Sequence, residues 1–121
     1  MATAFLVPSA SAKWKYFRSG SIADSTAKPR PGFALMGGGA QQDPAFLFLC
    51  ERTNGGDFLI LRANTEDDYA KKVDEEIKAL CPLNSAATIV FAEREDSDDP
   101  KVIQIIEQAE AIFFAGGDQS N

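Results

Sequence analysis

The 121-residue sequence contains no histidine. Ser–His–Asp and Cys–His nucleophile systems both need an imidazole, so these residues cannot form a self-contained centre of either kind, nor a His-ligated zinc site. The G-x-S-x-G nucleophile elbow and the G-x-x-x-x-G-K-[ST] phosphate loop are also missing. No apolar run approaches the roughly 20 residues that span a bilayer. We therefore expect no metal, no cofactor and no membrane partner.

Cysteine is scarce as well. Cys50 and Cys81 are far apart in the sequence and do not form a C-x-x-C motif. We interpret them as small buried hydrophobic residues of a protein in a reducing compartment, and we predict a cytoplasmic location. The start of the chain is rich in Ser and Ala and poor in acidic residues, so targeting to an organelle is the alternative.

Basic side chains are outnumbered by acidic ones, 12 against 18, which gives a net charge of −6. A nucleic-acid partner is therefore not expected. Residues 1–31 differ, because they carry five basic side chains and one acidic one. This segment shows no sustained apolar period, so we predict an extended or poorly ordered arm. Trp14, Tyr16 and Phe17 could pack the arm against a domain formed by residues 32–121.

Four short, continuous apolar runs stand out in that domain: residues 33–36, 58–61, 87–92 and 111–115. Runs of this length are typical of strands that are buried on both faces. Helical patterns lie between the runs. Strands that alternate with helices predict an α/β fold. We expect a flavodoxin-like three-layer sandwich with a parallel sheet, interrupted after its fourth strand.

The helical segments have recognisable starts. Asp43 and Asp99 are each followed by proline, which combines an N-cap with a favoured first helical residue. Between them, an apolar stripe within residues 67–80 predicts a further helix. In the last helix we expect four side chains to face inward, those of Val102, Ile103, Ile106 and Ala109. The acidic residues 93–99 are interpreted mainly as a solvated loop whose last members favour the helix N-terminus.

Both glycine-rich segments follow predicted strands. In open α/β sheets, ligands bind beyond the carboxyl ends of the strands, and glycine lets a ligand approach backbone N–H groups. Residues 37–39 and 116–120 are therefore the best candidates for a binding site, with tight turns that bind nothing as the alternative. A dinucleotide-binding site is a further alternative, because Arg62 could bind a ribose 2′-phosphate. However, Gln42 occupies the third glycine position of G-x-G-x-x-G.

Three segments carry a resemblance to a known family: FALMGGG at 33–39, DPAFLFLCERTNGGDFLILRA at 43–63 and AEAIFFAGGDQSN at 109–121. Together they resemble the amino-terminal half of cyanophycinase-like serine peptidases, over roughly residues 13–121. The resemblance implies a flavodoxin-like sheet similar to that of class I glutamine amidotransferases. It also implies hydrolysis of β-aspartyl or related peptide bonds.

The most specific part of the resemblance is AGGDQS. Gln119 matches the glutamine of the family's GGDQ motif and is expected to bind substrate. Neighbouring residues that would frame the same pocket are Gly38, Gly39, Gly117, Asp118 and Ser120. The family's nucleophilic serine and its histidine match nothing here, so no catalytic residue is assigned.

The sequence therefore predicts an amino-terminal fragment that is inactive alone and binds a peptide substrate when completed by downstream sequence. The sequence is also compatible with a homodimer. The alternative is a non-catalytic α/β module that binds a ligand or a partner.

Overall fold

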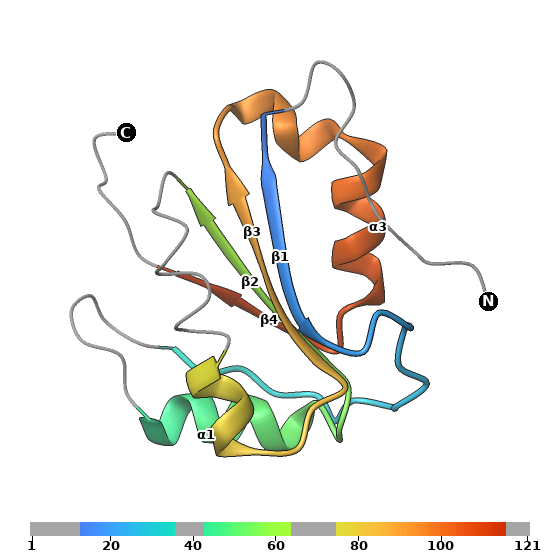
Figure 1. Cartoon of the computed structure of the whole chain (residues 1–121). Coiled ribbons are helices and arrows are strands. Elements are labelled where there is room, and N and C mark those ends of the chain that lie inside the picture. The colour runs from blue at the N-terminus through green and yellow to red at the C-terminus, as the bar shows by residue number, and fades with distance from the viewer. Residues whose placement is uncertain (1–12, 36–42, 64–74, 116–121) are drawn as a thin grey trace.

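The structure is a computed structural model that describes residues 13–35, 43–63 and 75–115 (Figure 1). Its elements in chain order are β1 (Lys15–Gly20), α1 (Asp43–Arg52), β2 (Asp57–Ala63), β3 (Ser85–Phe91), the 3-10 helix η1 (Arg94–Asp98), α3 (Pro100–Gln108) and β4 (Ala111–Phe114). Residues 75–80 are also helical. They belong to the predicted helix of residues 67–80, the start of which lies outside the described residues.

One four-stranded sheet forms the centre, in the order β1-β3-β2-β4. β2 pairs in parallel with β3 on one side and with β4 on the other. β1 pairs with β3 in the antiparallel direction, from Lys15 opposite Val90 to Gly20 opposite Ser85. The predicted α/β class is confirmed. The prediction of an entirely parallel sheet is wrong, because residues 15–20 of the predicted arm join the sheet at its edge.

The apolar run at residues 33–36 was expected to be the first strand, and this prediction is wrong for the part described. Residues 33–35 form no strand, and Phe33 and Leu35 are 92% and 96% exposed. The preceding residues are bonded to the end of α1 instead. Arg30 N donates to Arg52 O at 2.9 Å, and Arg52 Nε donates to Pro31 O at 3.2 Å. This tether holds the segment against α1.

Helices cover both faces of the sheet, which makes three layers (Figure 1). Alternate residues of β2 point to opposite faces, as the pleat requires. Leu59 and Leu61 pack in one core with Val102 and Ile105 of α3. On the other face is a second core, made of Phe46 of α1, Phe58 and Ile60 of β2, and Ile77 of the helix at 75–80.

The inward face of α3 differs from the prediction at one position. Val102 is fully buried, and Ile106 and Ala109 pack against the core as expected. Ile103 is 43% exposed, whereas Ile105 is 5% exposed. Because the helix begins at Pro100, residues 102 and 105, which are three positions apart, point toward the sheet.

Cys50 and Cys81 form a disulfide, with their Cα atoms 6.0 Å apart. The prediction of two free thiols is therefore wrong. α1 and the helix at 75–80 each precede a parallel strand of the same sheet, so both helices end at the edge where β2 and β3 begin. The cysteines are 31 residues apart in sequence but meet at this edge.

Trp14 provides a test of how firmly the amino-terminal segment is docked. Its side chain is 2% exposed, and Nε1 donates to Asp99 Oδ2 at 3.0 Å. We expect Trp14→Ala to lower the free energy of unfolding by about 3–5 kcal/mol, because it leaves a large cavity. Trp14→Phe should cost roughly half as much, since it keeps most of the packing. Urea unfolding measures both. Ile22→Ala, at a half-exposed site, is the control, and equal losses in W14A and I22A would contradict the docking.

Candidate functional site

The carboxyl ends of the three parallel strands lie along one edge of the sheet. From β2 the chain passes to β3 on one side and then to β4 on the other, so the strand order reverses between β2 and β4. Such a switch point is where open α/β sheets bind ligands. Ala115 N donates to Leu61 O at 3.0 Å, and this bond fixes the chain beside the end of β2 as it leaves β4.

The residues predicted for the binding site all lie outside the described part of the chain: Gly38, Gly39, Gly117, Asp118, Gln119 and Ser120. The structure therefore describes only the residues that flank them in the sequence. The first glycine segment lies between Leu35 and Asp43 in the sequence. The second follows Ala115 in the sequence, and Ala115 itself lies at the switch point between β2 and β4.

The same edge is closed above β3. Asp96 in η1 is 3% exposed and accepts backbone N–H bonds from Ala92 at 2.9 Å, Glu93 at 2.9 Å and Lys13 at 3.2 Å. Burial raises the pKa of Asp96, but these N–H groups outweigh burial and hold it below the ordinary value. The acidic run is thus not a wholly solvated loop, because Asp96 binds the start of β1 to the end of β3.

The ends of β2 and β4 are more open. Ala63 is exposed, and Phe114 is 76% exposed. Arg62, the candidate for a dinucleotide site, is half-buried in β2, while the acidic residues 66–68 near it in sequence lie outside the described residues. Among the described residues, the exposed end of β4 is directly followed by Ala115, the first residue of AGGDQS.

A buried polar cluster lies at the opposite, amino edge of the sheet. At its centre Asp57, the first residue of β2, is 6% exposed. Asp57 Oδ1 accepts from Ser85 Oγ at 2.6 Å, from Asn84 Nδ2 at 2.7 Å and from Arg18 NH2 at 3.4 Å, and Oδ2 accepts from Ser25 N at 3.1 Å. Burial raises the pKa of Asp57, but these donors together hold it below the ordinary value.

Two further carboxylates approach Asp57. Oxygen atoms of Asp24, Asp57 and Glu110 lie within 4.8 Å of one another, and Glu110 Oε1 accepts from Asp57 N at 2.9 Å. Burial and the neighbouring carboxylates raise the pKa of Glu110. Oxygen ligands of this kind suit a hard cation. However, both oxygens of Asp57 already accept hydrogen bonds, and one of the donors is the Arg18 guanidinium. The cluster therefore acts as an anchor of the fold.

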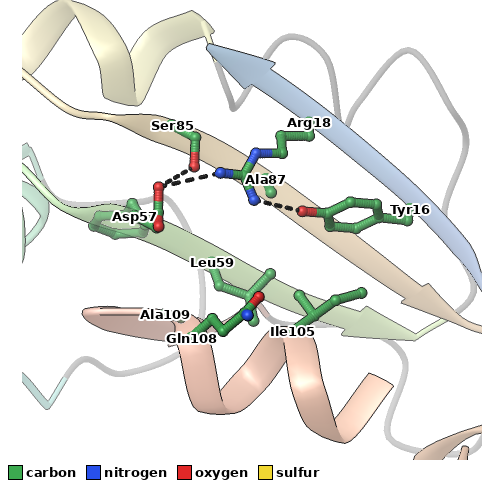
Figure 2. Close-up of a pocket in the computed structure, with 10 residues that line it drawn as sticks. Tyr16, Arg18, Asp57, Leu59, Ser85, Ala87, Ile105, Gln108 and Ala109 are labelled. Atoms are coloured by element: carbon green, nitrogen blue, oxygen red, sulfur yellow. Dashed lines mark hydrogen bonds and ion pairs between the residues drawn. The ribbon is translucent and has the colours of Figure 1, made fainter. Parts of the chain in front are cut away.

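Figure 2 shows the cavity beside this cluster, between the sheet and α3. Its polar wall includes Tyr16, Arg18, Asp57 and Gln108. The guanidinium also donates to Tyr16 Oη at 3.1 Å. The cavity volume is about 10 Å³, roughly what one water molecule needs. A peptide or a nucleotide does not fit in it.

Ser85 and Asp57 are close enough to suggest an activated nucleophile, but the arrangement does not support one. Ser85 is 1% exposed, its hydroxyl donates to a carboxylate, and the sequence has no histidine to act as base.

Sequence analysis did not identify this cluster. The available signal was a polar residue at the start of the strands, with Asp57 and Ser85 opening β2 and β3 and Glu110 preceding β4.

Comparisons with known proteins do not place the chain in a family, since no family model, curated protein or solved structure matches it. Within the described part of the chain, no helix is both long and apolar enough to cross a bilayer.

We expect Asp57→Ala to lower the free energy of unfolding by roughly 3 kcal/mol, because it leaves Arg18 and the surrounding donors without their shared acceptor. Denaturant unfolding at neutral pH measures the loss. Asp98→Ala is the matched control, since Asp98 is exposed and lies outside the cluster. A loss no larger in D57A than in D98A would show that the cluster does not anchor the fold.

Glu110 predicts a pH dependence of stability. Its pKa is raised in the folded state, so its contribution is complete below the ordinary value of 4.5 and declines as the pH rises through the folded pKa. Asp57 has a lowered pKa and loses its contribution only below 3.8, outside this window. Glu110→Gln keeps an acceptor for Asp57 N and removes the charge.

The E110Q variant should therefore match the wild type at pH 4.5 and have a higher Tm than the wild type at neutral pH. Thermal unfolding followed by circular dichroism across this range is the measurement. Glu107→Gln, at an exposed position of α3, is the control. The same pH profile in wild type and E110Q would contradict the raised pKa.

Proposed function

We propose that this chain forms the amino-terminal, substrate-binding part of a cyanophycinase-like serine peptidase that hydrolyses β-aspartyl or related peptide bonds. The observation that supports the proposal is the position of Ala115, the first residue of AGGDQS. Its N–H is bonded to Leu61 O at the switch point between β2 and β4. Ligand binding at a switch point is the general behaviour of open α/β sheets.

The strand order supports the same proposal. Counted along the chain, the parallel strands β2, β3 and β4 lie in the spatial order second, first, third. A flavodoxin-like sheet begins with this order. We infer that β2, β3 and β4 belong to a flavodoxin-like sandwich and that β1 is an additional antiparallel edge strand.

In this proposal Gln119 hydrogen-bonds a polar group of the peptide through its uncharged amide. Backbone N–H groups of residues 37–39 and 117–120 donate hydrogen bonds to the oxygen of the attacked carbonyl, on which negative charge develops. The nucleophilic serine and the histidine that moves its proton come from polypeptide outside these 121 residues, because this sequence contains no histidine. The proposed partner is a peptide substrate. The proposed location is the cytoplasm, where a disulfide such as Cys50–Cys81 is usually redox-sensing and not purely structural.

The endogenous protein provides the direct test. An antibody against residues 43–63 captures it, and intact mass spectrometry determines its size. We expect a mass well above 13.1 kDa and downstream peptides that contain a Gly-x-Ser-Ala-Gly turn and a histidine. The captured protein should hydrolyse a β-aspartyl dipeptide faster than its α-linked isomer.

Gln119→Ala in that complete protein should lower kcat/KM about 10-fold, mainly through a higher KM, as expected for one lost hydrogen bond to substrate. Gln104→Ala is the matched control, since Gln104 is exposed on α3. Equal kinetics in Q119A and Q104A would reject the assigned residue. A mass near 13.1 kDa without hydrolysis would reject the peptidase and leave a non-catalytic ligand- or partner-binding module.

A further inference from the structure

The disulfide joins the two helical segments that cover one face of the sheet. Cys50 lies in the last turn of α1 and is 1% exposed. Cys81 directly follows the helix at 75–80 and is half-buried. Their Cα separation of 6.0 Å lies within the range of ordinary disulfides. The bond therefore fixes the ends of both segments to each other at the amino edge.

The helix at 75–80 is mostly exposed to solvent, since its residues 75, 76, 78 and 79 are all exposed. Ile77 is its one buried side chain, at 2% exposure, and Leu80 packs partly against the same core. Lys78 adds an exposed bond from Nζ to Ser19 Oγ at 3.0 Å. The disulfide adds a covalent link between this mostly exposed segment and α1.

The opposite helical layer does not depend on the disulfide. Val102 and Ile105 of α3 are buried against β2 and β3. Asp99 caps α3 by accepting from Lys101 N at 2.9 Å, and it also accepts from Trp14 Nε1 at 3.0 Å. Breaking the disulfide therefore removes a constraint from one face of the sheet and leaves the other face intact.

We propose that the Cys50–Cys81 disulfide is a redox-responsive clamp, which a dithiol reductant opens to release the segment at 75–81 from α1 while β1 to β4 and α3 stay folded. This inference goes beyond the peptidase proposal and does not depend on it. It concerns residues of the described structure and holds whether or not the chain binds a peptide.

The chemistry is a thiol–disulfide exchange in two steps. A thiolate of the dithiol attacks Sγ of Cys81, which is the less buried of the two residues, and the bond to Cys50 breaks. Cys50 leaves as a thiolate and takes up a proton, beside the Ile77 carbonyl oxygen that lies 3.9 Å from its Sγ. The second thiolate of the reductant then attacks the mixed disulfide and releases Cys81. Two electrons pass from the dithiol, which becomes a disulfide, to the cysteine pair.

Hydrogen exchange followed by mass spectrometry tests the clamp on the wild-type chain. One sample is oxidised with glutathione disulfide, and the other is reduced with excess dithiothreitol. Peptide mapping without reductant verifies the Cys50–Cys81 link in the first sample. We expect reduction to increase exchange at least 10-fold at residues 75–81 and to leave α3 and β3 unchanged. We also expect the Tm to fall by roughly 10 °C, as estimated for a closed loop of this length.

C50A/C81A is the second readout. The double variant should exchange like the reduced wild type and should not respond to dithiothreitol. Equal exchange at 75–81 in the oxidised and reduced wild type would overturn the proposal. Loss of protection in α3 and β3 as well would also overturn it, because the disulfide would then hold the whole fold and not one segment. The wild-type comparison stands even where the double variant fails to fold.

Discussion

The buried carboxylate of Asp57 is the interaction on which the arrangement of the sheet depends. It begins the central strand β2 and accepts from Ser85 at the start of β3 and from Arg18 in β1. It also accepts from Ser25 in the segment that leaves β1. Its backbone N–H donates to Glu110, just before β4. One residue thus ties together the four strands at one edge, because a buried charge is stable only when its hydrogen bonds are made.

The two edges of the sheet therefore have different roles. The amino edge is closed by the Asp57 cluster and by the disulfide, and its cavity accommodates one water molecule. The carboxyl edge is closed above β3 by Asp96, yet Phe114 at the end of β4 stays exposed. The proposed binding of a peptide is therefore assigned to the carboxyl edge, where Ala115 follows β4. The proposed peptidase function uses this edge alone.

Local sequence patterns were sufficient for much of the fold. The runs at 58–61, 87–92 and 111–115 each contain most of a strand, since a continuous apolar run reflects burial on both faces. The starts of α1 and α3 were predicted from Asp-Pro pairs, and both helices begin within one residue of them. Such signals are local, so they are visible without knowledge of the tertiary structure.

Features that depend on distant partners were missed. β1 alternates only weakly in burial, and its pairing with β3 joins residues more than 60 positions apart. The disulfide and the Asp57 cluster likewise join positions far apart in sequence that only the folded sheet brings together. At residues 33–35 the apolar pattern predicted a strand, but the chain just before them is bonded to the end of α1 through Arg30 N and Arg52 O. The predicted residues of the binding site lie outside the described structure, so they stay predictions.

The most direct test of the division between the two edges is a titration of the complete ¹⁵N-labelled protein, with its downstream polypeptide, with a β-aspartyl dipeptide, followed by amide chemical shifts. The account predicts shifts at Ala115 and at residues 116–120 and 37–39, with the amides of Asp57 and Ser85 unchanged. Shifts centred on Asp57 and Ser85, or none anywhere at millimolar peptide, would contradict it.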